Sequence, residues 1–400
     1  MGAMVFVFIC NGTSFWECAS FDRFWLDVFF CLGAFFLDLR EKFSPSFNFE
    51  RLWIFVFIFL GYCFISLSWG HHLHDNLRGF FKFVRIYALL AMVLYLTTSH
   101  LFYQRLRWAL LVGLLLNNIN VIVQFFLGMD ISGQQAYSSR IQGAFNDPNT
   151  LSIYVGLLFP ILMTVMVDQK KISWFSGILL FLTSLSLYFS YTRVTIFFLF
   201  FFLLVVFLNW LKMRWRYKIL LSLLCFLVIF SIRPQQSLST FELFKNISTS
   251  PSVLERLYLW KIGMTMVKEK PMLGHGIASY TKINPKYFPE KMPYSADYLR
   301  YAYPHNGYLM LWIEIGLVGL VLYLLIFGEL IRIAIRYLQR SCNRNDQLVM
   351  GLYLCSMFVF LSTSFFDTFL MSTQSRSTFW LVMAMMLSKI RLEKDPSFEK

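Results

Sequence analysis

Long apolar runs separated by short polar connections dominate the 400-residue chain. A helix that crosses a bilayer needs about 20 predominantly apolar residues. Runs near this length are predicted as spans, and residues 1–19 form a further, short or interfacial candidate. The predicted spans are residues 24–39, 52–69, 83–98, 107–128, 151–167, 172–190, 194–211, 217–232, 306–329, 347–367 and 376–390. The pattern therefore predicts an all-α polytopic membrane protein with about 11–12 transmembrane helices.

One apolar stretch is too long for a single span. It runs from Ile172 to Leu211 and as one helix would measure about 60 Å, twice the thickness of the hydrocarbon core. The polar interruption inside it is "SYTRV", so Thr192 and Arg193 are expected to form a tight turn at a membrane face.

The composition excludes an ordinary soluble domain. Hydrophobic residues make up 58% of the chain, charged residues 14%, and the mean hydropathy is +0.58. The net charge of +14 comes from basic residues in the short connections, where they orient spans, so nucleic acid is not an expected partner. The seven cysteines lack zinc-type spacing, and no cleavable signal is evident, so the first spans are expected to direct membrane insertion.

Alternate connections hold the basic clusters and are expected to be cytoplasmic. The opposite, outward connections are residues 129–150, 192–194, 370–376 and the long segment 233–304. The predicted organisation is an N-terminal transmembrane bundle (1–232), an outward segment (233–304), C-terminal transmembrane helices (305–390) and a cytoplasmic tail (391–400).

The outward segment contains one amphipathic helix in "SVLERLYLWKIGMTMVKEKPMLGHG". Ser252 and Glu255 resemble a capping box, and Pro271 followed by two glycines ends the helix. Arg256 and Trp260 are one turn apart and share a face, while apolar side chains on the helix could lie on lipid or on the spans.

Outward arginines are candidates for binding phosphate, because the guanidinium stays charged and donates two parallel hydrogen bonds. They are Arg140, Arg193 and Arg256. Arg193 and Arg256 could instead reach lipid headgroups. Arg140 precedes "GAFNDPNT", whose turn-forming residues shape backbone rather than bind lipid.

His305, Asn306 and Glu314 stand where the chain enters a span. A neutral imidazole can accept the proton of an attacking sugar hydroxyl, although an interfacial histidine can also be chemically silent. Asn306 could orient a sugar or the imidazole, or cap the helix. Glu314 lies about two and a half turns deeper on roughly the opposite face, so we expect it to meet a polar group inside the bundle in a structural role.

Two other polar groups have weaker functional interpretations. "HHLHD" places His71, His72 and His74 together, but no second cluster completes a metal site, so no metal is expected. Asp367 and Arg376 flank the last outward turn and could pair with each other or contact substrate.

Several motifs resemble the O-antigen ligase and polymerase superfamily of bacterial envelope polysaccharide assembly. They are "RIQGAFNDPN", "YTR" at a span end, "ERLYLWKIGMTMVKEKPMLGHG" and "HNGYLMLWIEIGLVG", and they cover about residues 140–330. His275 departs from the family, which more often has an apolar residue at that position, so its role is open.

The resemblance implies a GT-C-like glycosyltransferase of the bacterial inner membrane that works on the periplasmic face without cofactor, metal or nucleotide sugar. The donor would be an undecaprenyl-diphosphate-linked glycan, and the acceptor a sugar of lipid A core for a ligase or a lipid-linked repeat for a polymerase. By analogy Arg193 and Arg256 hold the diphosphate, Arg140 assists, and His305 activates the acceptor. Asn306, Trp260 and Tyr308 would contact substrate.

The rival class is a transporter or flippase of the lipid-linked glycan, and a protein-glycosylating relative is a further alternative. Transporters usually carry their polar groups near the bilayer midplane, whereas here these groups gather at one face. We therefore expect an enzyme in which Arg140, Arg193, Arg256 and His305 meet in one outward cavity beside membrane lipids.

Overall fold

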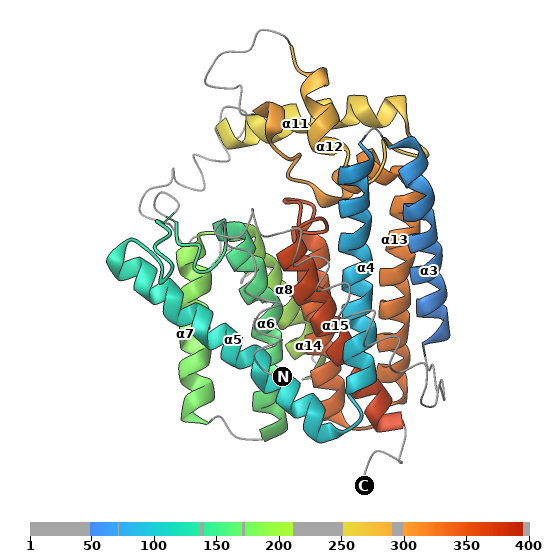
Figure 1. Ribbon diagram of the computed structural model, residues 1–400. Helices are drawn as coiled ribbons and strands as arrows, with labels where there is room; N and C mark the ends of the chain where they lie inside the picture. The colour runs from blue at the N-terminus through green and yellow to red at the C-terminus, as the bar shows by residue number, and fades with distance from the viewer. Residues whose placement is uncertain are drawn as a thin grey trace. The chain divides into compact units, whose positions relative to one another are not determined.

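The computed structural model describes residues 49–70, 72–136, 140–169, 173–210, 251–289 and 299–394. Within these ranges the chain is helical, with one isolated bridge between Met129 and Gln135 and no strand. The helices (Figure 1) are α3 (Glu50–Ile65), η2 (Ser66–Trp69), α4 (Leu73–Leu96), α5 (His100–Leu127), α6 (Pro148–Gln169), α7 (Trp174–Ser190), α8 (Arg193–Trp210), α11 (Pro251–Glu269), α12 (Tyr280–Ile283), η3 (Asn284–Tyr287), α13 (Gly307–Arg340), α14 (Arg344–Thr363) and α15 (Thr373–Lys394).

The prediction of an all-α polytopic membrane protein is confirmed. Each predicted span within the described ranges is a helix, and seven of those helices are long and apolar enough to cross a membrane. α7 is apolar but shorter, with 17 residues, and α15 is not among the seven. The candidate spans at 24–39 and 217–232, and the short candidate at 1–19, lie outside the described residues.

The chain turns inside the long apolar stretch as predicted, but the turn lies at Tyr191 and Thr192, and Arg193 already belongs to the next helix. α7 ends at Ser190, Tyr191 adopts a left-handed conformation with φ 50°, and α8 begins at Arg193. A left-handed residue directly after a helix stops the helical path, so one apolar run becomes two helices.

The chain forms two compact units. Unit 1 comprises Met1–Trp53, Phe83–Thr192 and Gln374–Lys400, and unit 2 comprises Ile54–Lys82 and Arg193–Thr373. The predicted division at residues 232, 304 and 390 separates transmembrane from outward and cytoplasmic segments, and it stays a prediction.

Unit 1 contains α5, α6 and α7, and α5 runs obliquely across the other two (Figure 1). Its interior includes polar contacts: the buried Asn118 of α5 donates to Thr183 at 2.9 Å and accepts from Ser186 at 2.7 Å, both on α7. Hydrogen bonds of this kind join apolar helices that no hydrophobic force holds together in lipid.

In unit 2, α8 packs along α14 in the antiparallel direction. Phe198 meets Phe366 with ring centroids 6.2 Å apart, and Phe202 meets Phe358 at 5.4 Å. Residue numbers that rise along α8 therefore fall along α14. The N-terminus of α8 consequently lies at the end of the bundle where α14 finishes.

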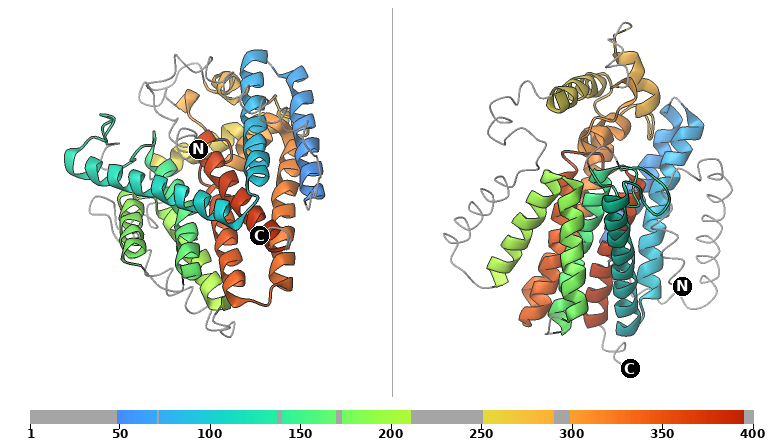
Figure 2. Two further views of the ribbon diagram at one scale, coloured as in Figure 1. Left: turned by 60° about the horizontal axis from the view of Figure 1, so that its bottom comes forward. Right: turned by 90° about the vertical axis from the view of Figure 1, so that its left-hand side faces the viewer.

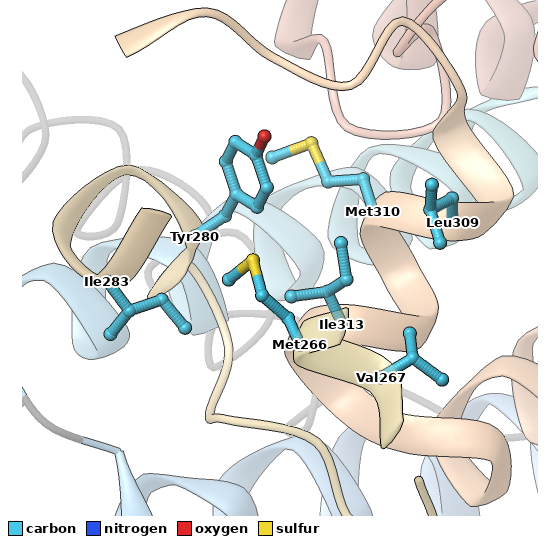
Figure 3. Packing of buried hydrophobic residues seen from close by; sticks show 7 residues of the cluster. All are labelled: Met266, Val267, Tyr280, Ile283, Leu309, Met310 and Ile313. Atoms are coloured by element: carbon cyan, nitrogen blue, oxygen red, sulfur yellow. The ribbon is translucent and has the colours of Figure 1, made fainter. Parts of the chain in front are cut away.

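α11 and α12 lie together at one end of α13, and α11 runs across α13 rather than along it (Figures 1 and 2). A compact apolar cluster joins the three helices (Figure 3). Its buried members are Met266 and Val267 of α11, Tyr280 and Ile283 of α12, and Leu309, Met310 and Ile313 of α13. The amphipathic helix predicted from sequence is α11. It begins at Pro251, which places Ser252 in its first turn.

α13 is broken at Gly316, which has φ 67° and ψ −178°. The free backbone groups at the break are satisfied by residues 271–276, which we call the strap. The N–H groups of His275 and Gly276 donate to the carbonyls of Ile313 (2.9 Å) and Glu314 (2.8 Å). Beyond the break, the N–H groups of Leu317 and Val318 donate to the strap carbonyls of Pro271 (3.0 Å) and Met272 (3.2 Å). The hydrogen bonds lost at the break are thus replaced, as an apolar environment requires.

Glu314 sits beside this break with its side chain buried, as the sequence predicts for a carboxylate with polar partners. Its Oε2 accepts the Ala278 N–H at 2.9 Å, and its Oε1 accepts the Tyr280 N–H at 3.3 Å. The carboxylate thereby ties the start of α12 to α13.

Candidate functional site

His305 lies at the entrance of α13 in a strained backbone conformation. Its φ is 45°, one of three positive values among the non-glycine residues of the described ranges. Such a conformation is costly for a residue with a Cβ and persists where surrounding contacts enforce it, often at functional sites.

The imidazole of His305 faces the carboxylate of Asp367. His305 Nδ1 is buried and lies 3.4 Å from Asp367 Oδ1, while the His305 side chain is 39% exposed. The exposed part of the ring is therefore the edge away from Nδ1. Nδ1 makes no hydrogen bond at this distance, so the carboxylate acts on the ring through its charge, and the exposed nitrogen is left available to a ligand. Sequence reasoning offered Asp367 only as a partner of Arg376 or as a substrate contact, and missed this pairing.

The backbone around His305 is clamped to the turn that follows α14. The Gly307 N–H lies within hydrogen-bonding distance of the carbonyls of Ser364 (2.8 Å) and Asp367 (3.0 Å). Asn306 caps α13, because its side-chain oxygen accepts from the N–H groups of Tyr308 (3.1 Å) and Leu309 (3.0 Å). Of the roles considered for Asn306, the structure shows the helix cap, which occupies its side-chain oxygen.

Two predicted substrate contacts have their polar atoms engaged by backbone. The Trp260 indole N–H donates to the Pro304 carbonyl at 2.7 Å, directly before His305. The Tyr308 hydroxyl donates to the Leu361 carbonyl at 2.8 Å, and its ring lies 4.2 Å from that of Phe365. The polar groups of both residues therefore bind backbone carbonyls of the protein itself.

Arg256 lies one helical turn before Trp260 on α11. Residues four apart share a face of a helix, and Trp260 reaches the carbonyl next to His305, so Arg256 is carried on the face that meets this segment. The Arg256 side chain is half-buried, and it makes no hydrogen bond or ion pair with the rest of the described chain. A cation without a protein partner is suited to an anionic ligand.

Arg193 is the first residue of α8. It stands about one and a half turns before Phe198, whose ring meets Phe366. The antiparallel pairing of α8 with α14 therefore brings Arg193 to the same end of unit 2 as the turn that holds Asp367 and, through it, His305.

Arg140 belongs to unit 1, where it joins a loop to the end of α7. Its Nε donates to the Ser190 carbonyl at 3.0 Å, and its Nη2 donates to Asn149 Oδ1 at 2.8 Å and Thr192 Oγ1 at 2.9 Å. This arrangement orders the loop before α6. The expected convergence of Arg140 with the three site residues of unit 2 stays a prediction.

Comparison with known proteins supports the resemblance seen in the motifs. Residues 178–324 match the family described as O-antigen ligase, a segment that includes Arg193, Arg256 and His305. Over this segment the chain is similar to the O-antigen ligase-like superfamily. Arg140 and Asp367 lie outside the matched segment.

Relatives in Rickettsia share shorter stretches. A Rickettsia felis protein named "Putative polysaccharide ligase" is 34% identical over 84 residues, which are 20% of this chain and 20% of the relative. A Rickettsia bellii protein of the same name is 29% identical over 116 residues, 28% of this chain and 26% of the relative. The matches cover about a fifth to a quarter of the length of these relatives, so the comparison shows a similarity to part of each relative and not a reaction.

His275, the departure from the family pattern, is part of the strap. Its side chain is buried, its Nε2 lies 2.9 Å from the Met266 carbonyl, and its N–H donates to Ile313. These contacts give His275 a structural role at the break in α13.

His71 lies outside the described residues. Among the described residues, the histidines near α4 do not form a group that could hold a metal ion. His74 Nδ1 lies 3.7 Å from Asp75, and Asp75 also lies 3.6 Å from Lys282. This is a charge cluster between the start of α4 and α12.

Proposed function

We propose that this protein transfers a polysaccharide from undecaprenyl diphosphate to a sugar of lipid A core on the periplasmic face of the bacterial inner membrane. The observation that carries the proposal is the His305–Asp367 pair, placed at the mouth of a membrane span with the imidazole partly exposed. The match to the O-antigen ligase family and the names of the Rickettsia relatives favour a ligase over the related polymerase.

In the proposed reaction, an acceptor hydroxyl oxygen attacks the anomeric carbon of the donor sugar. The new carbon–oxygen bond forms as the bond from that carbon to the diphosphate oxygen breaks, and its electron pair leaves with undecaprenyl diphosphate. The hydroxyl proton passes to the exposed nitrogen of His305. Asp367 orients the ring and stabilises the imidazolium that results.

The leaving group gains negative charge as the bond breaks, so cations directed at it lower the barrier. Arg256 fits this role because it has no ion-pair partner among the described residues, and Arg193 fits because it begins α8 at the same end of unit 2. Arg140 assists by ordering the loop before α6. Side-chain cations then provide the charge stabilisation that a metal ion provides in other transferases.

Both substrates are anchored in lipid, and this also contributes to the reaction. The spans hold the polyprenyl chain in hydrocarbon, while the reacting sugar and phosphate meet at the water edge. Restricting two reactants to one surface and one orientation removes much of the entropy cost of their encounter.

The test uses purified protein, lipid-linked polysaccharide and rough lipopolysaccharide in mixed micelles. His305→Ala is expected to abolish transfer, and Asp367→Asn is expected to slow it about a hundredfold or more, because the ring loses its orienting charge. His74→Ala, which removes an exposed histidine from the charge cluster near α4, should transfer at the wild-type rate. Full activity of His305→Ala would end the proposal.

A second pair tests the cation. Arg256→Ala should abolish transfer with normal membrane insertion, whereas Lys261→Ala, which removes an exposed cation of the same helix, should leave it unchanged. Chelation of divalent cations should not slow the reaction. Elongation of lipid-linked repeats in place of transfer to core would identify a polymerase, and movement of lipid-linked glycan across vesicles without transfer would identify a flippase.

A further inference from the structure

The segment that leads into His305 is held by three side chains. The Asn284 amide donates to the Arg300 carbonyl at 2.9 Å, the Tyr280 hydroxyl donates to the Ala302 carbonyl at 3.2 Å, and the Trp260 indole donates to the Pro304 carbonyl at 2.7 Å. Every second carbonyl from residue 300 to residue 304 thus accepts from a side chain. We call this set of three hydrogen bonds the carbonyl ladder.

The donors of the carbonyl ladder are themselves fixed. Tyr280 is fully buried, and its ring belongs to the cluster of α11, α12 and α13, with its hydroxyl at the edge of that cluster (Figure 3). Asn284 is fully buried, and Trp260 packs against the same cluster. Donors placed by a packed core hold their acceptors more firmly than mobile surface groups.

Glu314 holds the start of α12, which carries one donor of the carbonyl ladder. Its carboxylate accepts the N–H groups of Ala278 and Tyr280, so the start of α12 cannot move without breaking a buried, charge-assisted hydrogen bond. Burial, with a smaller effect from the Glu314 charge, raises the pKa of Tyr280 above its usual value, so the hydroxyl stays protonated and able to donate. The Tyr280 ring also stacks on Tyr303, with centroids 6.2 Å apart.

We propose that Tyr280, Asn284 and Trp260 are positioning residues that hold His305 in its left-handed conformation, with the imidazole against Asp367. The inference rests on the proposed function, because it assigns these residues a part in the same transfer. A residue with φ 45° requires contacts that enforce it, and the ladder ends on the carbonyl of the preceding residue. Without the donors, the backbone can relax and the ring can leave the carboxylate.

The ladder gives Trp260 a role different from the substrate contact predicted from sequence. A residue that binds substrate mainly affects KM, whereas a residue that positions the base mainly affects kcat. Trp260→Phe keeps an aromatic ring and removes the N–H donor, so it separates the two roles.

The experiment measures transfer kinetics and hydrogen exchange on the full-length protein in detergent. Tyr280→Phe and Trp260→Phe each remove one donor and keep an aromatic ring. Each should lower kcat about tenfold, leave KM for the donor within about twofold of wild type, and speed amide exchange in the peptide covering residues 299–309. Tyr287→Phe is the matched control, because the Tyr287 hydroxyl donates to Glu269 rather than to the ladder. It should change neither quantity.

The outcomes separate this inference from the proposed function. Unchanged exchange in both ladder variants overturns the ladder, whatever the activity of the wild type. Faster exchange with unchanged kcat also overturns it, because the segment would then be held without consequence for His305. A raised KM with unchanged kcat in Trp260→Phe returns that residue to substrate binding. An inactive wild-type protein with faster exchange in the variants rejects the proposed transferase and with it the positioning of His305, while the ladder itself would remain.

Discussion

Residues 307–315 form the first part of α13. The backbone departs from helical geometry on both sides of it, at His305 and at Gly316, and the two departures are held in different ways. At the deep end, Gly316 has φ 67°, and the strap satisfies the break with backbone N–H and carbonyl groups. At the outer end, His305 has φ 45°, and side chains of α11, α12 and η3 hold the backbone before it.

The difference predicts which end can be altered by single substitutions. Backbone hydrogen bonds at the break do not depend on side-chain identity, but they require two chain segments to approach so closely that no Cβ fits between them. The carbonyl ladder depends on three side chains that can each be altered separately. A substitution that adds a Cβ at the break is therefore expected to disrupt the fold, whereas a substitution in the carbonyl ladder is expected to remove a single hydrogen bond.

The largest expected effect comes from adding a Cβ at the break. In Gly316→Ala the methyl group would collide with the Met272 carbonyl, and alanine is also strained at a positive φ. A backbone carbonyl cannot yield as a flexible side chain can, so we expect a loss of about 3 kcal/mol or more in stability and little folded protein. Thermal unfolding in detergent, followed by loss of the monodisperse peak, measures this effect.

The matched control for this substitution is Gly328→Ala in the same helix. Nothing lies within 4 Å of a Cβ at Gly328, and its backbone is helical, so the thermal midpoint should stay the same or rise slightly. A normal melting temperature for Gly316→Ala would mean that the strap and α13 do not meet as closely as described.

A smaller effect is expected at Glu314, which connects the two ends. Glu314→Leu leaves the N–H groups of Ala278 and Tyr280 without an acceptor, which costs about 2–3 kcal/mol for buried donors. Glu314→Gln keeps one oxygen acceptor and should cost about half as much. Thermal midpoints of the two variants test this order. Equal stability of the leucine variant and wild type would show that α12 is anchored by other contacts.

The sequence predicted the elements of this structure well because the bilayer restricts them. A span needs a long apolar run, so the hydropathy pattern alone located α13 and α14, and the Asn306 cap could be considered from its position before an apolar run. The buried, partnered state of Glu314 also followed, because a lone carboxylate inside a span is costly.

The features that could not be predicted depend on contacts between distant segments. Asp367 lies in the turn after α14, and no local pattern links it to His305. The glycines of "GHG" were interpreted only as a helix stop, but Gly274 also allows the strap to approach α13, and Gly276 allows it to approach Gly70 and Asn76. Gly316 lies two residues after Glu314 in a run that is otherwise apolar, and the run has no local signal for a break, so the break cannot be recognised until its partner segment is known.

The smallest expected effect compares two inactive variants at the entrance. Both His305→Ala and His305→Gly remove the imidazole and should lack transfer activity. They differ in backbone strain, because a left-handed conformation costs alanine about 1 kcal/mol relative to glycine. The glycine variant should therefore melt a few degrees above the alanine variant, even though glycine usually lowers stability. If alanine is the more stable of the two, the entrance relaxes to an ordinary conformation when the imidazole is removed, and the carbonyl ladder does not enforce the left-handed geometry by itself.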